Sequence, residues 1–297
     1  MNKIIKIALA LLILGFVGSV VFTIVSGTSF GEITGTESYE YIEKTYTKDQ
    51  FTGFDFSLED KCVIILPSET DDIVIKYYES ELNWIEIDET GSTLVFDNKI
   101  KWYVGMIWGW NWYRLPQYQK LYLYVPQDIV YSYRMDSSNG DFTISEGIIA
   151  STIDFLSSNG DMTLTDVQAT ASIRVKSSNG NLTLTNVETP TSVDARTSNG
   201  RIVFSDVSAS SILARTSNGR ITGTGIDTPS LDAQTSNGLV DVTVSGSQSD
   251  YHLTMTTSNG SYYLNGTKVT TNSYNTDKTN TVRLQSSNGD VKVRFSE

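Results

Sequence analysis

The tripeptide Ser-Asn-Gly occurs eight times in this chain of 297 residues, and its regular spacing constrains the fold more than any other feature. Successive copies are separated by 20, 20, 20, 19, 19, 22 and 29 residues. A fixed period near twenty is typical of a solenoid in which each repeat forms one coil. The glycines of the eight copies are Gly140, Gly160, Gly180, Gly200, Gly219, Gly238, Gly260 and Gly289.

Apolar and polar residues alternate on both sides of each tripeptide. Apolar residues fall two and four places after the glycine, as at Met162 and Leu164, and a second pair precedes the next copy, as at Ile173 and Val175. Such alternation predicts strands with one buried face. Each period is therefore expected to hold two short strands and two turns.

Asn-Gly is a turn dipeptide because both residues tolerate positive φ, so Ser-Asn-Gly is expected to form a corner. Identical corners at one period would stack about 4.8 Å apart, with asparagine side chains bonded to one another along the stack. An antiparallel array of hairpins is the alternative. The predicted fold class is all-β: a single-stranded β-helix, or solenoid, with coils of about 20 residues, preceded by one transmembrane helix.

The N-terminal segment has the pattern of a membrane anchor. Lys3 and Lys6 precede an uncharged run from Ile7 to Val25. This run is long enough to cross the hydrocarbon core of a bilayer, and the lysines predict a cytoplasmic N-terminus. A cleaved signal peptide is the alternative. We expect a single-pass protein of the cell membrane with the bulk of the chain extracellular.

Four segments are expected along the chain. Residues 1–28 form the signal anchor and residues 29–50 a linker. Residues 51–120 form an irregular β cap or the first coils, with an aromatic insert at 101–114, and residues 121–297 form the solenoid. Residues 30–100 hold 17 acidic and 5 basic residues, within a chain of net charge −12. This charge would repel nucleic acid, which we exclude as a partner.

Five basic residues flank three consecutive corners. Stacked coils would bring their side chains beside the same edge, which predicts an anion-binding patch, for example for an anionic cell-wall polymer. A solvated, partly compensated face is the alternative. The candidate residues are Lys176, Arg196, Arg201, Arg215 and Arg220.

Tryptophans concentrate in the aromatic insert, which is the second candidate site. Trp102, Trp108, Trp110 and Trp112 are expected to form an interface with the membrane or a partner, or a hydrophobic plug on the solenoid.

Hydroxyl residues follow the inward positions after each corner, in a Thr-x-Thr ladder that begins at Thr143 and Ser145 and breaks at Val203 and Asp241. The ladder resembles the ice-facing ladder of β-solenoid antifreeze proteins, although the breaks make the face less uniform.

Motifs for catalysis are missing from the sequence. Cys62 is the one cysteine, so it has no partner for an internal disulfide. His252 is the one histidine, so the sequence holds no cluster of His and Cys spaced for a zinc site. We predict no catalytic, cofactor-binding or metal-ligating residues and no cofactor, and we expect that the protein is not an enzyme. A polysaccharide-active enzyme that uses carboxylates on one face, such as Asp141 and Asp161, is the alternative.

The repeated unit Ser-Asn-Gly-x-hydrophobic-Thr-hydrophobic, the strand ending Tyr124-Val125-Pro126 and the N-terminal anchor resemble one bacterial family. It is the putative-adhesin domain-of-unknown-function family, which includes LiaG-like envelope proteins. The resemblance covers about residues 51–297. It implies a β-helix outside a Gram-positive membrane that serves as a binding or scaffolding surface at the cell envelope. The alternative it leaves is an accessory component of an envelope-stress sensing system that acts through an envelope membrane protein.

Overall fold

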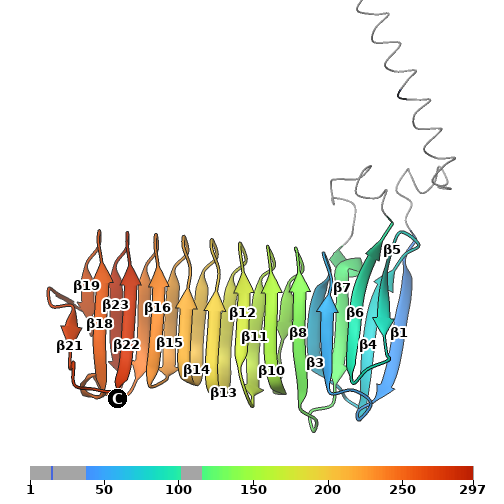
Figure 1. Cartoon of the computed structure of the whole chain (residues 1–297), viewed down its shortest axis with the longest axis horizontal. Helices are drawn as coiled ribbons and strands as arrows, with labels where there is room; N and C mark the ends of the chain where they lie inside the picture. The colour runs from blue at the N-terminus through green and yellow to red at the C-terminus, as the bar shows by residue number, and fades with distance from the viewer. Residues whose placement is uncertain (1–14, 16–37, 102–115, 297) are drawn as a thin grey trace, which may run out of the picture.

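The alternating residues of each period form parallel strands that pair in register with the same positions of the next coil. Met162 pairs with Leu182 and Ile173 with Val193, one period apart. This computed structural model describes residues 15, 38–101 and 116–296. Figure 1 shows the coils side by side along one axis. The parallel pairing confirms the predicted solenoid and rules out the array of hairpins.

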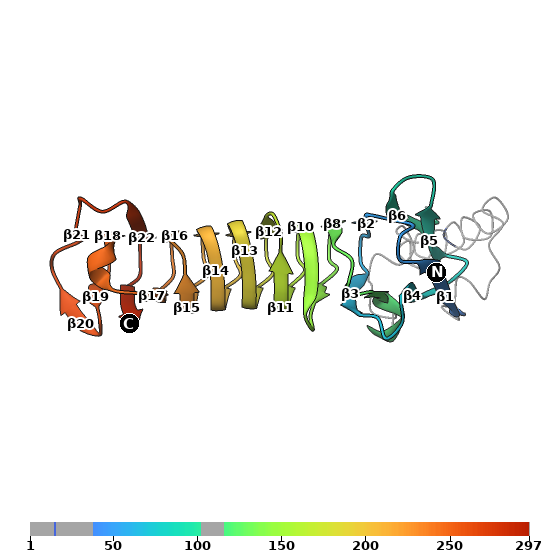
Figure 2. The ribbon, with the colours of Figure 1, turned by 90° about the horizontal axis from the view of Figure 1, so that it is seen from below.

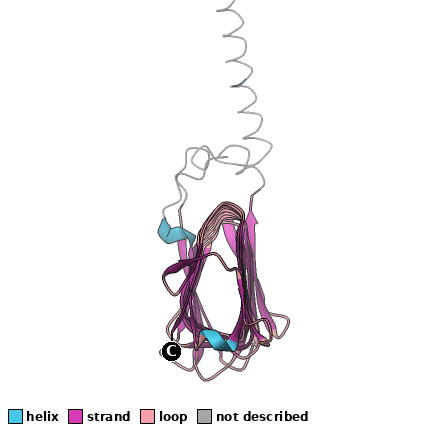
Figure 3. Ribbon diagram, turned by 90° about the vertical axis from the view of Figure 1, so that its left-hand side faces the viewer, coloured by secondary structure: helices cyan, strands magenta, loops and turns pink. Residues whose placement is uncertain are grey.

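One continuous sheet of 23 strands winds around the core and has two long sides (Figure 3). Side A consists of strands that follow the corners: β3 (Cys62–Pro67), β7 (Lys120–Val125), β9 (Phe142–Ile144), β11 (Met162–Ala169), β15 (Ile221–Asp227), β17 (Val240–Ser245), β19 (Tyr262–Leu264) and β23 (Val291–Ser296). Side B consists of strands that lead into the corners: β2 (Gly53–Ser57), β6 (Thr93–Ile100), β8 (Tyr131–Ser137), β12 (Ile173–Ser177), β16 (Ser230–Thr235), β18 (Tyr251–Thr257) and β22 (Asn280–Ser286).

Three longer strands lie at the bend opposite the corners: one begins just after the bend, and two run through it. They are β10 (Ile148–Ser157), β13 (Leu182–Arg196) and β14 (Ile202–Arg215). Strands β13 and β14 run from side A into side B. The bend is made by residues in the left-handed conformation, such as Asp166 (φ 54°), Asn186 (φ 50°) and Asp206 (φ 55°). Gly225 takes this position in the next coil (φ 61°). Asn, Asp and Gly are the residues that adopt this conformation most readily.

Stacked asparagines join the Ser-Asn-Gly corners, as the sequence predicted. Asn199 Nδ2 donates to Asn179 Oδ1 at 2.6 Å, and Asn218 Nδ2 donates to Asn199 Oδ1 at 2.7 Å. The equivalent bond joins each of the remaining neighbouring pairs in the stack of eight asparagines, at 2.6–2.8 Å. At the N-terminal end, Asn139 Nδ2 donates to Asp60 Oδ1 at 2.6 Å, so residues 59–61 act as a ninth, divergent corner.

The corner glycines are required for a different reason from the one expected. None of them has a positive φ. A Cβ on Gly180 would instead lie 1.8 Å from the carbonyl oxygen of Gly160 in the preceding coil. Glycine is needed because the backbones of successive coils approach too closely for any side chain.

Lys61 stands in the glycine column at the divergent corner. No Ser-Asn-Gly corner precedes it in the stack, because β6 and β7 are connected through residues 101–119. The Lys61 side chain is buried, and its Nζ donates to the carbonyl oxygens of Tyr78 at 2.7 Å and Tyr118 at 3.2 Å. A side chain is therefore accommodated in this column only at its end.

The spatial order of coils departs from the order in the sequence at both ends. Strand β22 pairs with β16 on one side and with β18 on the other, and β23 lies between β17 and β19. The last repeat is therefore the second-to-last coil, as Figure 1 shows. At the N-terminal end, β2 lies between β6 and β8, and β3 between β7 and β9. The Ser-Asn-Gly corners thus stack as predicted, in sequence order except for the last two, which are exchanged.

Antiparallel elements close both ends of the solenoid. The N-terminal cap contains β1 (Glu40–Thr47), β4 (Asp72–Glu79), β5 (Asn83–Asp88) and the 3-10 helix η1 (Pro116–Gln119). The C-terminal cap contains β20 (Thr267–Val269), β21 (Ser273–Tyr274) and the 3-10 helix η2 (Gln248–Asp250). Figure 2 shows both caps at the ends of the row of coils. Covered ends prevent edge-to-edge pairing with other chains.

Residues 40–47, which lie in the predicted linker, form β1. This strand pairs antiparallel with β4, from Glu40 opposite Glu79 to Thr47 opposite Asp72. The buried Tyr46 on β1 donates from its hydroxyl to Glu89 at 2.6 Å. Packing of the alternate apolar residues of β1 against the cap accounts for the extra strand.

The predicted anchor lies outside the described residues except for Gly15. Within the part of the chain that the structure describes, no helix is long and apolar enough to cross a bilayer.

Candidate functional site

Three of the five predicted basic residues lie in one column on side B, directly before the corners. Lys176 pairs with Arg196, and Arg196 pairs with Arg215, in successive coils. Their side chains line an open groove of about 440 Å³ that runs along the solenoid axis. The serine hydroxyls of the corners, including Ser198 and Ser217, form its other wall.

Acidic side chains partly compensate this basic column. Asp194 accepts from Arg196 at 2.6 Å and lies 3.4 Å from Lys176 Nζ. Asp232 lies 3.4 Å from the guanidinium of Arg215. The column along the groove therefore combines three cations with two carboxylates, which compensate part of its charge.

Arg201 and Arg220 lie across the corners, where side A begins. Both side chains are exposed. The Arg201 backbone N–H donates to Asn181 Oδ1 at 3.2 Å, and the Arg220 carbonyl accepts from Ile202. Neither guanidinium has an ion pair or hydrogen bond with a residue in the described ranges. Two uncompensated cations thus stand in adjacent coils, about 4.8 Å apart along the axis.

A column of serine and threonine residues, which the sequence reasoning missed, holds the corner rigid beneath these cations. Thr197 Oγ1 accepts from the N–H of Gly200 at 3.2 Å and donates to the carbonyl of Gly180 at 2.9 Å. Thr216 repeats both bonds one coil later, at 3.1 and 3.0 Å. The sequence contains the signal for this column, because each of the eight Ser-Asn-Gly tripeptides is directly preceded by Ser or Thr.

The other candidates do not join this site. Trp102, Trp108, Trp110 and Trp112 lie outside the described residues. The Cys62 thiol is a free thiol beside Asp141, and burial raises its pKa. Among residues 38–101 and 116–296 no group of His, Cys, Asp or Glu is arranged to hold a metal ion.

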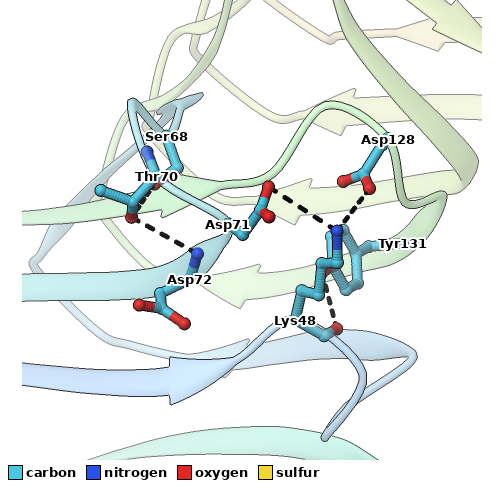
Figure 4. A network of polar contacts seen from close by, with 7 residues as sticks. All are labelled: Lys48, Ser68, Thr70, Asp71, Asp72, Asp128 and Tyr131. Atoms are coloured by element: carbon cyan, nitrogen blue, oxygen red, sulfur yellow. Dashed lines mark hydrogen bonds and ion pairs between the residues drawn. The ribbon is translucent and has the colours of Figure 1, made fainter.

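A second charged cluster, shown in Figure 4, is internally paired. Lys48 Nζ lies 2.6 Å from Asp128 and 3.6 Å from Asp71, and the Lys48 carbonyl accepts from the Tyr131 hydroxyl at 2.9 Å. The hydrogen bond from Lys48 lowers the pKa of Asp128. These contacts tie together three loops that follow β1, β3 and β7, so we assign the cluster a structural role.

Comparison with known families supports the solenoid fold. The Toastrack DUF4097 family matches residues 52–294, which is most of the chain and all the coils. The chain belongs to the Toastrack family. This places it among the putative-adhesin domains of unknown function that the repeat resembles. No match is found among curated proteins.

Comparison with solved structures finds similar chains at low sequence identity. A putative adhesin from Parabacteroides distasonis aligns with a TM-score of 0.52 and 12% identity, over 86% of this chain and 97% of that one. A putative adhesin from Bacteroides fragilis aligns at 15% identity with a TM-score of 0.45, over 86% and 97% of the two chains. The first of these likenesses shows the fold alone.

Proposed function

We propose that this Toastrack protein is a membrane-anchored scaffold outside the cell whose basic corners bind an anionic polymer of the envelope. The observation that carries the proposal is the pair of uncompensated guanidinium groups, Arg201 and Arg220, beside a basic groove that runs along the axis. The uncharged run from Ile7 to Val25 supports the anchor. The structural neighbour from Parabacteroides distasonis is a putative adhesin, which agrees with a binding role.

The arrangement suits a linear anion better than a single small one. Cations recur once per coil at the strand spacing of about 4.8 Å, so successive phosphates of one chain can meet successive arginines. The planar guanidinium group binds phosphate oxygens in a bidentate manner. The role requires binding only, and it assigns no catalytic chemistry to the protein.

The test is cosedimentation of the full-length protein, in mild detergent, with cell walls that retain or lack their anionic polymers. We expect binding that needs the polymers and weakens as salt rises, because salt screens exposed charges. The double variant Arg201→Ser/Arg220→Ser should bind about 5- to 30-fold more weakly, since two exposed charged contacts contribute about 1–2 kcal/mol.

The matched control is Lys268→Ser/Lys278→Ser, which removes the same charge from two exposed positions in the C-terminal cap, away from the groove. It should bind like the wild type. Equal losses in both double variants would show that net charge alone drives the binding. Failure of the wild type to bind at low salt would overturn the proposal.

A further inference from the structure

Side A carries two rows of outward side chains without a single charge, which we call the uncharged strip. Strand pairing places them in register across seven coils, and the inward residues between them are buried. The first row is Tyr122, Ile64, Thr143, Thr163, Thr183, Val203 and Thr222. The second row is Tyr124, Leu66, Ser145, Thr165, Thr185, Ser205 and Thr224.

The missing charge is a property of this strip and not of the protein surface in general. On side B the corresponding outward column alternates in sign, through Asp55, Arg134, Asp154, Arg174 and Asp194 in successive coils. Charged residues also border the strip on both sides, at the corners and at the opposite bend. A charged ligand would therefore find partners on side B and along the borders of the strip, and none within its two rows.

The N-terminal end of the strip is aromatic and aliphatic. The rings of Tyr122 and Tyr124 lie 6.4 Å apart and are inclined by only 18° to each other. Ile64 and Leu66 pair with them on the next strand, and all four side chains are partly exposed. Lys76, opposite Tyr122 on β4, borders the strip at this end, and its Nζ lies 5.3 Å from the centre of the Tyr124 ring. The partly exposed, nearly parallel rings form a platform for a partner that offers an apolar face.

Beyond the tyrosines the strip presents hydroxyl groups at regular intervals. Thr163 and Thr165 pair with Thr183 and Thr185, so each of these coils adds two hydroxyls at the strand spacing of about 4.8 Å. A hydroxyl both donates and accepts hydrogen bonds. The strip thus combines aromatic planes at one end with a row of neutral hydrogen-bonding groups along its length.

We propose that the uncharged strip binds an extended, uncharged glycan. The apolar C–H face of a sugar ring would pack on Tyr122 and Tyr124, and the hydroxyl groups of the following sugars would bond to the threonine rows. The match is one of charge and chemistry, because the ligand is neutral and rich in hydroxyls like the surface. This site differs in position and ligand from the basic corners.

The experiment is cosedimentation of the full-length protein with two uncharged glycans, crystalline cellulose and chitin, at about 1 M salt. At this salt concentration the Debye length is about 3 Å, so electrostatic binding at the basic corners is largely screened. We expect the wild type to bind at least one glycan. Tyr122→Ala/Tyr124→Ala should weaken binding about tenfold or more, as loss of stacking does at other aromatic platforms. Tyr122→Phe/Tyr124→Phe should stay within about threefold, because the rings remain.

Tyr263→Ala is the matched control, since Tyr263 faces outward on side A beyond the strip, near Lys292. It should bind like the wild type, and far-UV circular dichroism should show all variants folded. No binding of the wild type to either glycan would overturn the proposal, and so would unchanged binding by the double alanine variant. A dimer that this variant converts to monomer would also overturn it, by showing that a second copy covers the strip.

Discussion

Substituting Gly180 with alanine tests most severely whether close stacking of the corners holds the solenoid together. A Cβ at this position would lie 1.8 Å from the carbonyl oxygen of Gly160 and 2.5 Å from its carbonyl carbon. Both are backbone atoms, so no side chain can rotate away. Relieving the clash to an ordinary contact, which begins at 3.4 Å, requires a shift of about 1.6 Å between the coils.

That shift would break the bonds that join the two corners. Asn179 Nδ2 donates to Asn159 at 2.6 Å, and Ser177 Oγ donates to the Gly160 carbonyl at 3.1 Å. Overpacking costs about 1–3 kcal/mol, and each lost hydrogen bond costs about 1 kcal/mol more. We expect Gly180→Ala to lower the free energy of unfolding by about 3–5 kcal/mol.

Urea denaturation followed by far-UV circular dichroism measures this loss. With an m-value of about 3 kcal/mol/M, the midpoint should fall by about 1–2 M. Gly91→Ala is the matched control, because the nearest atom to its Cβ would be 3.8 Å away. It should change stability by less than about 0.5 kcal/mol. A Gly180→Ala midpoint within 0.5 M of wild type would refute the close-approach argument.

Three further predictions concern the asparagine stack, the N-terminal cap and the order of the coils. Asn199→Ala removes two ladder bonds and Asn259→Ala one, so urea midpoints should show the first loss to be about twice the second. The hydrogen bond from Tyr46 lowers the pKa of Glu89, so it contributes stability above the ordinary carboxyl pKa that is lost as pH falls through the lowered value. Tyr46→Phe should therefore destabilise the protein at pH 7 and progressively less in acid, and NMR titration should show the pKa of Glu89 rising. The coil order places Asn288 beside Asn237 and Asn259 one coil further on, so the variant Asn237→Cys/Asn288→Cys should form a disulfide on oxidation and Asn237→Cys/Asn259→Cys should not, as non-reducing electrophoresis would show; the reverse result would contradict the observed coil order.

The coil itself was predictable, because the period and the alternation both repeat. Met162 and Leu164 align with Leu182 and Leu184 in sequence and pair with them in space. The asparagine stack also followed, since identical side chains at one period must stack when the coils do. These features depend only on local pattern, which single sequences carry well.

The order of the last two coils was not predictable from the same pattern. Val282 and Leu284 of the last repeat are as suitable as Leu253 and Met255 to stack on Leu231. An apolar pair fits any neighbouring pair, so the alternation carries no information about which coil comes next. The antiparallel strands β20 and β21, which cover β18 and β19, show which coil is last.

The sequence predicted which basic residues share a column, but it only partly predicted how their charges are paired. The period places Lys176, Arg196 and Arg215 in one column, as the structure confirms. Compensation of this column was the alternative, but its partners Asp194 and Asp232 were not identified, although Asp194 stands two residues before Arg196 and so shares its face. Because this pairing neutralises part of the column, the proposed anion site rests on Arg201 and Arg220 instead.

The measurement that tests the central claim most directly is the salt dependence of binding between the full-length protein and poly(glycerol phosphate). The slope of log K against log salt counts the phosphates that the protein neutralises, at about 0.7 for each contact on a single-stranded polyanion. For Arg201→Ser/Arg220→Ser the account predicts a slope shallower than that of wild type by about 1.4. Identical slopes for the two proteins would show that these arginines contact no phosphate, and would contradict the account.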